Sequence, residues 1–278
     1  MTSSYLDRLA ARSTAVGTVL CVGLDPDVTS LPPGFTPDLA GLERFTMLLI
    51  EATVASAAAF KANLAFYESH GSAGLAVLER IRARIPSDVP FIADAKRGDI
   101  DSTAAAYADA WLSDASPLAA DAVTAHAYLG LAALLPLVRL AATTGRGVLV
   151  VARSSNPEGR SLQQAITSGG PAVEDMILGE IAALNGSPDV PTGTVGAVVG
   201  ATLEPSVFPL SQLGGVILAP GLGAQGAGPD EVARRFAGCR PGTVLPSSSR
   251  ALLSAGPDPA ALRRRAASAV RELAAAMG

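Results

Sequence analysis

Eight short apolar runs alternate with stretches of helical character along this chain, and no other feature restricts its fold as strongly. Each run is nearly continuous in Val, Leu, Ile and Ala, which is the pattern of strands buried on both faces of a parallel sheet. We expect strands over residues 18–24, 60–66, 91–94, 121–125, 147–152, 195–199, 215–219 and 242–245.

One helix is expected before the first run, over residues 5–15. Helices are expected after the runs over residues 38–58, 70–85, 101–113, 130–142, 171–184, 230–236 and 258–277, with a short helical turn over 206–213. Asp258 with Pro259 marks the start of the last one, as an N-cap followed by proline at the first helical position. Alternating β and α units indicate a parallel sheet in an α/β fold. Eight units in 278 residues favour a closed (β/α)8 TIM barrel over an open sheet. No Pro- or Ser-rich linker divides the chain, so we predict a single domain over residues 1–278.

Composition excludes several classes of function. A net charge of −4 argues against non-specific binding to nucleic acid. No apolar run approaches the roughly 18 residues of a membrane span, and the first residues lack the apolar core of a secretory signal. Cys21 and Cys239 build no disulfide framework, and His70 and His126 are the only histidines, so a zinc site is not expected. The expectation is a cytoplasmic, reduced, soluble enzyme.

Polar residues gather at one end of nearly every expected strand. These positions are Asp25, Lys61, Asp94 with Lys96, Thr124 with His126, Ser154 to Asn156, Thr202, Gln225 and Arg250. Barrel enzymes carry their chemistry at the carboxyl ends of the strands, so we expect one site at the barrel mouth. His126 is a rival general acid there, although a neutral, structurally hydrogen-bonded histidine is the favoured interpretation.

Asp94, Lys96 and Asp99 place one amine between two acids at the end of the third strand. Along a strand, Asp94 and Lys96 point to the same side. Burying three charges is costly, and neighbouring carboxylates keep a buried lysine protonated. On local sequence alone an ordinary ion pair remains possible. The polar residues at the other strand ends favour a functional cluster.

A glycine-rich loop follows the seventh strand. Gly221, Gly223, Gly226 and Gly228 surround Gln225, and Arg250 ends the eighth strand. Glycines let backbone N–H groups approach a ligand, and arginine suits phosphate oxygens. Loops after strands seven and eight of barrels are the usual phosphate site, so we expect one here, with the loop as a closing lid.

The segment at residues 94–100, DAKRGDI, resembles the DxKxxDI motif of the orotidine 5′-phosphate decarboxylase family, and Thr103 matches the threonine that follows it. Segments 23–25, 60–61, 198–202, 220–226 and 249–250 resemble other motifs of that family, so the likeness covers the whole domain. Residues 61–68 and 154–159 look closer to its longer bacterial branch, type 2.

The resemblance implies roles for ten residues. Lys96 matches the catalytic lysine, Asp94 and Asp99 its two aspartates, Asp25, Lys61 and Thr103 the ribose contacts, Gln225 and Arg250 the phosphate contacts, and Ser154 or Ser155 the serine that reads the pyrimidine edge. Which serine does so stays open. In that family the second aspartate comes from the neighbouring subunit of a homodimer. The family loop often ends in two adjacent glycines, where this chain has Gly226-Ala227-Gly228.

The implied activity is decarboxylation of orotidine 5′-phosphate to uridine 5′-phosphate, the last step of de novo UMP biosynthesis. The family uses no cofactor: the lysine faces the carbanion at C6 and then donates it a proton. The implied partners are the nucleotide substrate and a second subunit, with neither nucleic acid nor a membrane.

Two alternatives remain. The first is a metal-assisted sugar-phosphate decarboxylase with a related barrel. Such an enzyme would need an additional acidic residue at the end of the second strand to bind the metal, where this chain has Lys61 and Asn63. A non-catalytic phosphate-binding barrel would not require the cluster of Asp94, Lys96 and Asp99.

Overall fold

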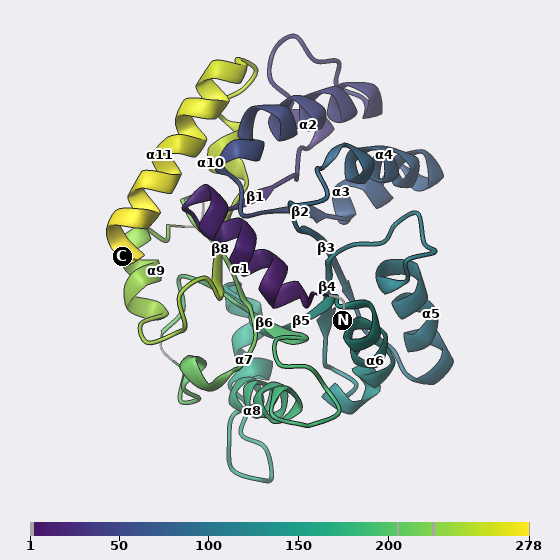
Figure 1. The fold of residues 1–278 in the computed structure, drawn as a ribbon, viewed down its shortest axis with the longest axis vertical. Helices are drawn as coiled ribbons and strands as arrows, with labels where there is room; N and C mark the ends of the chain where they lie inside the picture. The colour runs from purple at the N-terminus through teal and green to yellow at the C-terminus, as the bar shows by residue number, and fades with distance from the viewer. Residues whose placement is uncertain (1–2, 205, 224–225, 278) are drawn as a thin grey trace.

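The structure, a computed structural model, describes residues 3–204, 206–223 and 226–277. Eight parallel strands form a closed barrel in chain order, with β8 returning to pair with β1 (Figure 1). The strands are β1 (Cys21–Gly23), β2 (Ala59–Asn63), β3 (Phe91–Arg97), β4 (Ala122–His126), β5 (Gly147–Arg153), β6 (Val195–Val199), β7 (Ile217–Pro220) and β8 (Val244–Ser248). The predicted (β/α)8 barrel is confirmed.

Helices surround the barrel and connect its strands (Figure 1). The α-helices are α1 (Tyr5–Val16), α2 (Leu39–Thr53), α3 (Ala65–Glu68), α4 (Gly71–Arg84), α5 (Asp101–Leu112), α6 (Leu135–Thr144), α7 (Arg160–Gln163), α8 (Val173–Asn185), α9 (Pro229–Arg235), α10 (Arg250–Leu253) and α11 (Pro259–Met277). Short 3₁₀ turns are η1 (Val28–Ser30), η2 (Val54–Ser56), η3 (Leu131–Leu134), η4 (Pro157–Gly159) and η5 (Leu210–Gln212). The carboxylate of Asp258 accepts hydrogen bonds from the N–H groups of residues 260 and 261, as expected of a helix cap.

Two strand boundaries differ from the prediction in ways that affect the site. β2 ends at Asn63, and Phe66 lies in α3 instead of the strand. The Asn63 side chain accepts a hydrogen bond from the Ala65 N–H at 3.2 Å, which turns the chain out of the sheet. β3 continues past Asp94 to Arg97, so that Lys96 is part of the sheet.

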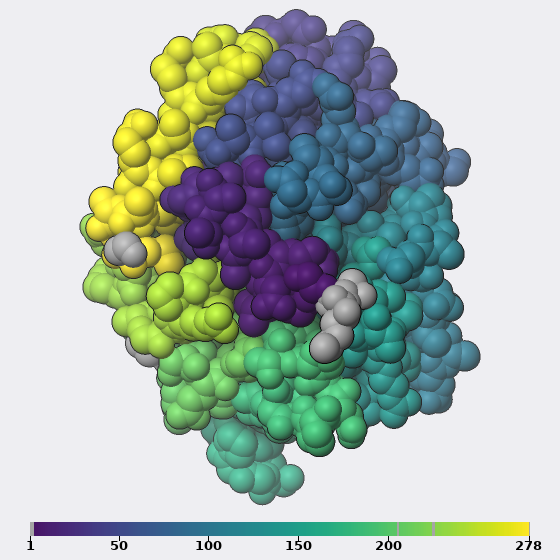
Figure 2. All heavy atoms as spheres, viewed as in Figure 1, coloured from purple at the N-terminus to yellow at the C-terminus, as the bar shows by residue number. Residues whose placement is uncertain are grey.

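Helix α1 closes the amino-terminal end of the barrel. Tyr5 and Leu9 are 1% and 0% exposed and pack with the inward side chains of the lower strands. Gly147 makes room for them, because a Cβ at that position would lie 2.7 Å from the Tyr5 ring. Figures 1 and 2 show α1, in purple, lying across the centre of this face. The bottom of the barrel is therefore filled, and ligands must approach from the carboxyl ends of the strands.

None of the helices in the described part of the chain combines the length and apolar composition that crossing a bilayer requires.

Candidate active site

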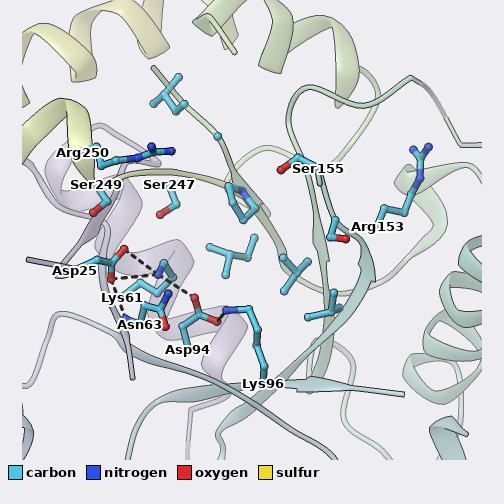
Figure 3. Close-up of a pocket in the computed structure, with 18 of the residues that line it drawn as sticks. Asp25, Lys61, Asn63, Asp94, Lys96, Arg153, Ser155, Ser247, Ser249 and Arg250 are labelled. Carbon is cyan, nitrogen blue, oxygen red and sulfur yellow. Dashed lines mark hydrogen bonds and ion pairs between the residues drawn. The ribbon is translucent and has the colours of Figure 1, made fainter. Parts of the chain in front are cut away.

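A cavity of about 370 Å³ opens at the carboxyl ends of the strands (Figure 3). Seven of the residues predicted to form the site line it: Asp25, Lys61, Asp94, Lys96, Ser154, Ser155 and Arg250. They come from β1, β2, β3, β5 and β8 or from the loops that follow them. The predicted meeting of the strand ends at one mouth is confirmed for these residues.

Four charges of alternating sign run along one wall of the cavity. The Lys61 ammonium lies 3.4 Å from the Asp25 carboxylate and 3.0 Å from Oδ2 of Asp94. The other oxygen of Asp94, Oδ1, lies 2.7 Å from the Lys96 ammonium. Asp25 is held in turn by the N–H of Asn63, at 2.8 Å. Each acid and amine therefore has an oppositely charged neighbour, which is what burial of such groups requires.

Lys61 is the buried lysine of this wall. It is 5% exposed, whereas the side chain of Lys96 is 51% exposed. Among the described residues Lys96 forms an ion pair with Asp94 alone, and the expected second carboxylate, from a partner subunit, is not part of the single chain. The buried amine between two carboxylates of this chain is Lys61, which lies two residues before the end of β2, between β1 and β3.

Burial and neighbouring charges set the ionisation of these groups. Burial raises the pKa of Asp94, but the Lys61 and Lys96 ammonium groups outweigh it and hold the pKa at about 2. Burial lowers the pKa of Lys61, but Asp25 and Asp94 raise it by more, so the net shift is upward. At neutral pH the wall thus presents ionised Asp94 beside protonated Lys61.

The backbone of β3 is irregular where it presents Lys96. Lys96 has a φ of 48°, in the left-handed region that side-chain-bearing residues seldom adopt. The pairing of β3 with β4 shifts register between Ala93 and Arg97, which is the signature of a β-bulge. Bulges of this kind turn a side chain in a new direction, and here they aim Lys96 back toward Asp94 (Figure 3).

Asp99 and Thr103 lie apart from the cavity of their own chain. The Asp99 carboxylate accepts a hydrogen bond from the N–H of Ile100 at 2.8 Å, and Thr103 is exposed on α5. Ile100, which follows Asp99, is 51% exposed, and Tyr128 and Leu129, which follow β4, are 74% and 52% exposed. The structure therefore does not bring the second aspartate of the motif to Lys96 within one subunit.

The loop after β7 has the backbone that its glycines predict. Gly221, Gly223 and Gly226 have φ values of 117°, 81° and 95°, which favour glycine. Ala227 accepts a hydrogen bond from the Gly223 N–H at 2.9 Å, which closes the loop on itself. Arg250 projects toward the cavity from the start of α10 (Figure 3). Gln225, the other predicted phosphate contact, lies outside the described residues.

The two candidate serines after β5 differ in their orientation. The Ser154 hydroxyl donates to Asn156 at 2.6 Å and accepts from the Gln163 amide at 2.6 Å, so it is engaged within its own loop. Ser155 points toward the centre of the cavity (Figure 3).

Sequence reasoning missed several lining residues. Arg153 is 3% exposed and forms an ion pair with Glu174 of α8 at 3.0 Å, its guanidinium directed away from the cavity centre (Figure 3). Ser247 and Ser249 line the cavity from alternate positions at the end of β8, and the two-residue period of a strand could have revealed them.

One ring nitrogen of His126, Nδ1, is buried without a hydrogen-bond partner among the described residues. The backbone at Gly98 passes so close that a Cβ there would lie 2.6 Å from the His126 carbonyl oxygen.

Within the described residues, no group of three or more His, Cys, Asp or Glu side chains is arranged to hold a metal ion.

Comparisons with known proteins identify a family and relatives whose sequences resemble this chain. A family model described as the orotidine 5′-phosphate decarboxylase / HUMPS family matches residues 18–265. A Salinispora arenicola protein named orotidine 5′-phosphate decarboxylase is 45% identical over 268 residues, which cover 96% of each chain.

Solved structures show the same likeness. The crystal structure of a proposed orotidine 5′-phosphate decarboxylase from Streptomyces avermitilis has a TM-score of 0.89 at 42% identity, covering 99% of this chain and 96% of that one. The Leishmania donovani OMP decarboxylase has a TM-score of 0.77 at 29% identity, covering 99% and 98%.

Proposed function

The chain belongs to the orotidine 5′-phosphate decarboxylase / HUMPS family, and we propose that it converts orotidine 5′-phosphate to uridine 5′-phosphate and CO₂. One observation carries the proposal. A single cavity has the alternating wall of Asp25, Lys61, Asp94 and Lys96 on one side and Arg250 with the glycine-rich loop on another. Its volume of about 370 Å³ lies in the range of small-ligand sites.

The chemistry follows from the charges of this wall. When the bond between C6 and the carboxyl group breaks, its electron pair stays on C6 and CO₂ leaves. A protonated Lys96 next to C6 stabilises that developing negative charge and then transfers a proton to it, regaining one from solvent. At an effective dielectric constant of about 20, an ion pair at 4 Å is worth roughly 4 kcal/mol, so further barrier lowering must come from elsewhere in the site.

We propose that binding of the substrate phosphate supplies the further lowering of the reaction barrier. Arg250 provides a planar cation, and Gly221 and Leu222 bring the backbone of the loop after β7 to the same cavity. Binding energy from a remote group can hold the substrate in the reactive orientation and exclude water once the loop closes. We assign Gln225 to the same phosphate from the family motif, and Asp25 and Lys61 to the ribose.

We propose that Ser155, and not Ser154, reads the pyrimidine. A serine that reads the pyrimidine must have its side chain directed at the bound base. Ser155 is the serine that points toward the cavity centre (Figure 3).

We further propose a homodimer in which Asp99 and Thr103 enter the cavity of the partner subunit. Support comes from their position outside their own cavity and from large exposed apolar residues, Ile100 after Asp99 and Tyr128 with Leu129 after β4. Large exposed apolar side chains are typical of protein interfaces when they form a patch. The half-exposed Lys96 would then gain a second carboxylate on its open side.

Further proposals concern the domain organisation, the cellular location with the pathway step, and the need for cofactors. We propose that residues 1–278 form one domain, since all eight strands belong to one barrel. We also propose a cytoplasmic enzyme that acts in the last step of UMP synthesis, and that it works without a metal or other cofactor.

The test is an assay of purified protein with orotidine 5′-phosphate, with and without a chelator. We expect turnover that survives chelation and is lost in Lys96→Ala, while uridine 5′-phosphate still binds to that variant. Turnover that stops on chelation and returns with Mg²⁺ would favour the metal-assisted alternative. Tight binding without any turnover in the unaltered chain would point to a phosphate-binding barrel.

A further inference from the structure

A buried threonine connects the two charged groups at the proposed reaction centre. Thr124, in β4, is 0% exposed. Its hydroxyl donates a hydrogen bond to Oδ1 of Asp94 at 2.9 Å and accepts one from the backbone N–H of Lys96 at 2.9 Å. The Asp94 oxygen that it contacts is the one that also receives the Lys96 ammonium, at 2.7 Å.

The position of Thr124 in the sheet explains why a side chain is needed there. β3 and β4 pair at Ala93 with Val123 and next at Arg97 with Ala125. Between these pairs, residues 94–96 of β3 lie opposite Thr124 alone. A bulge leaves backbone N–H groups without their ladder partner, and an unpaired buried N–H is unfavourable. The Thr124 hydroxyl supplies the missing acceptor to Lys96.

The same contact holds a strained conformation. Lys96 has a φ of 48°, which a residue with a side chain adopts only when its surroundings enforce it. The hydrogen bond from the Lys96 N–H to the Thr124 hydroxyl helps to hold this backbone conformation. The hydrogen bond from the Thr124 hydroxyl to Asp94 orients the carboxylate that pairs with Lys96. One hydroxyl thus determines where the ammonium and the carboxylate lie relative to each other.

We propose that Thr124 is a positioning residue of the decarboxylase site, which places the Lys96 ammonium through its backbone and the Asp94 carboxylate through its side chain. The proposal rests on the role given to Lys96 under the proposed function. Thr124 itself does not touch the substrate. Its effect should therefore appear in the rate of the chemical step and not in substrate binding.

The test compares Thr124→Val, which keeps the shape and removes the hydroxyl, with Thr124→Ser, which keeps the hydroxyl. We expect Thr124→Val to lower kcat by about 10- to 100-fold, with KM and the Kd for uridine 5′-phosphate changed less than about threefold. Thr124→Ser should stay within about threefold of the unaltered kcat, because it restores both hydrogen bonds.

Two controls separate this role from packing. Thr53→Val removes another buried hydroxyl, one that bonds the Leu49 carbonyl in α2 at 2.7 Å, and it should leave kcat unchanged. Thr124→Ala removes the same hydroxyl without adding a methyl group and replaces Thr124→Val if that variant does not fold. Thermal unfolding of every variant reports on the fold.

Full activity of Thr124→Val, or an equal loss of kcat in Thr124→Val and Thr124→Ser, would overturn the proposal. Failure of both Thr124→Val and Thr124→Ala to fold would also overturn it, because the threonine would then serve stability. Lys96→Ala separates a failure of the proposed function from a failure of the Thr124 proposal. If Lys96→Ala retains turnover, the role given to Lys96 is wrong. If Lys96→Ala is inactive while Thr124→Val is fully active, only the role given to Thr124 is wrong.

Discussion

Lys96 combines an unusual backbone conformation with the charge that the chemistry needs. The left-handed region costs a residue with a side chain roughly 1–2 kcal/mol relative to the right-handed one. Lys96 is held there, at a φ of 48°, by the bulge in β3 and by the hydrogen bond to Thr124. Strain of this kind persists only where the surroundings determine it, and it gathers at functional sites. The lysine is thereby aimed before any substrate arrives.

Asp94 makes the stability of the protein depend on pH in the acid range. Its pKa of about 2 lies below the ordinary 3.8, because Lys61 and Lys96 outweigh the effect of burial. A carboxyl whose pKa is lowered by folding contributes stability above its unfolded pKa and loses it as the pH falls through its folded pKa. The contribution, about 2 kcal/mol, should be complete above pH 4 and disappear toward pH 2.

Urea unfolding at a series of pH values between 6 and 2 checks this prediction on the unaltered chain and Asp94→Asn. The difference in unfolding free energy between them should be constant above pH 4 and narrow by about 2 kcal/mol toward pH 2. Asp189→Asn, at an exposed loop position, is the matched control and should parallel the unaltered chain. A difference that stays constant down to pH 2 would contradict the prediction.

At the scale of elements, the end of β5 is anchored to α8 through a buried ion pair. Arg153 and Glu174 are 3% and 9% exposed at their side chains and lie 3.0 Å apart. Arg153 also donates to the carbonyl of Glu204 at 2.7 Å, and its own carbonyl accepts from the Gly200 N–H at 2.9 Å. The residue before the two serines is thus tied to both α8 and the loop after β6, which holds the proposed pyrimidine-reading loop in place.

Removing one partner of this pair should destabilise the protein strongly, since a buried charge is left without its counterion. We expect Glu174→Ala to lower the unfolding free energy by about 3–5 kcal/mol. Glu180→Ala, an exposed position on the same helix, should change it by less than about 0.5 kcal/mol. Denaturant titrations measure both. Equal effects of the two variants would show that the ion pair does not anchor β5.

For the whole molecule, the open question is which groups surround Lys96 in the assembled protein. Among the described residues of the single chain, only Asp94 forms an ion pair with Lys96, whose side chain is 51% exposed. The second aspartate of the motif lies outside the cavity, next to the exposed Ile100. A symmetric dimer would place the same surface of each subunit against the other and complete both sites at once.

Mixing inactive variants tests this arrangement. Lys96→Ala and Asp99→Ala chains should each be inactive, but a mixed dimer has one site with an intact Lys96 and a partner's intact Asp99. Random reassortment should restore about a quarter of the unaltered activity per chain. Lys96→Ala mixed with Asp94→Ala should restore none, because those residues pair within one chain at 2.7 Å. No recovery in the first mixture would show that Asp99 does not act across an interface.

Local patterns were sufficient to predict the barrel and the location of the site. The apolar runs identified the strands with errors of a few residues at their ends, since those ends depend on contacts such as the Asn63 side chain with the Ala65 N–H. Asp94 and Lys96 do lie close together, but the bulge between Ala93 and Arg97, and not the two-residue period of a regular strand, turns Lys96 toward Asp94. Arg153 was missed because its partners, Glu174 and Glu204, are remote in the sequence.

By itself, the sequence determined the order of the β and α units and the residue types at the strand ends, because hydrophobic period and strand length are local properties. The depth of Lys61, the loop contacts of Ser154 and the bridge that Thr124 forms between Asp94 and Lys96 depend on the tertiary structure. They arise from contacts between segments that are remote in the sequence: at the β3 bulge, two extra residues in β3 leave residues 94–96 opposite Thr124.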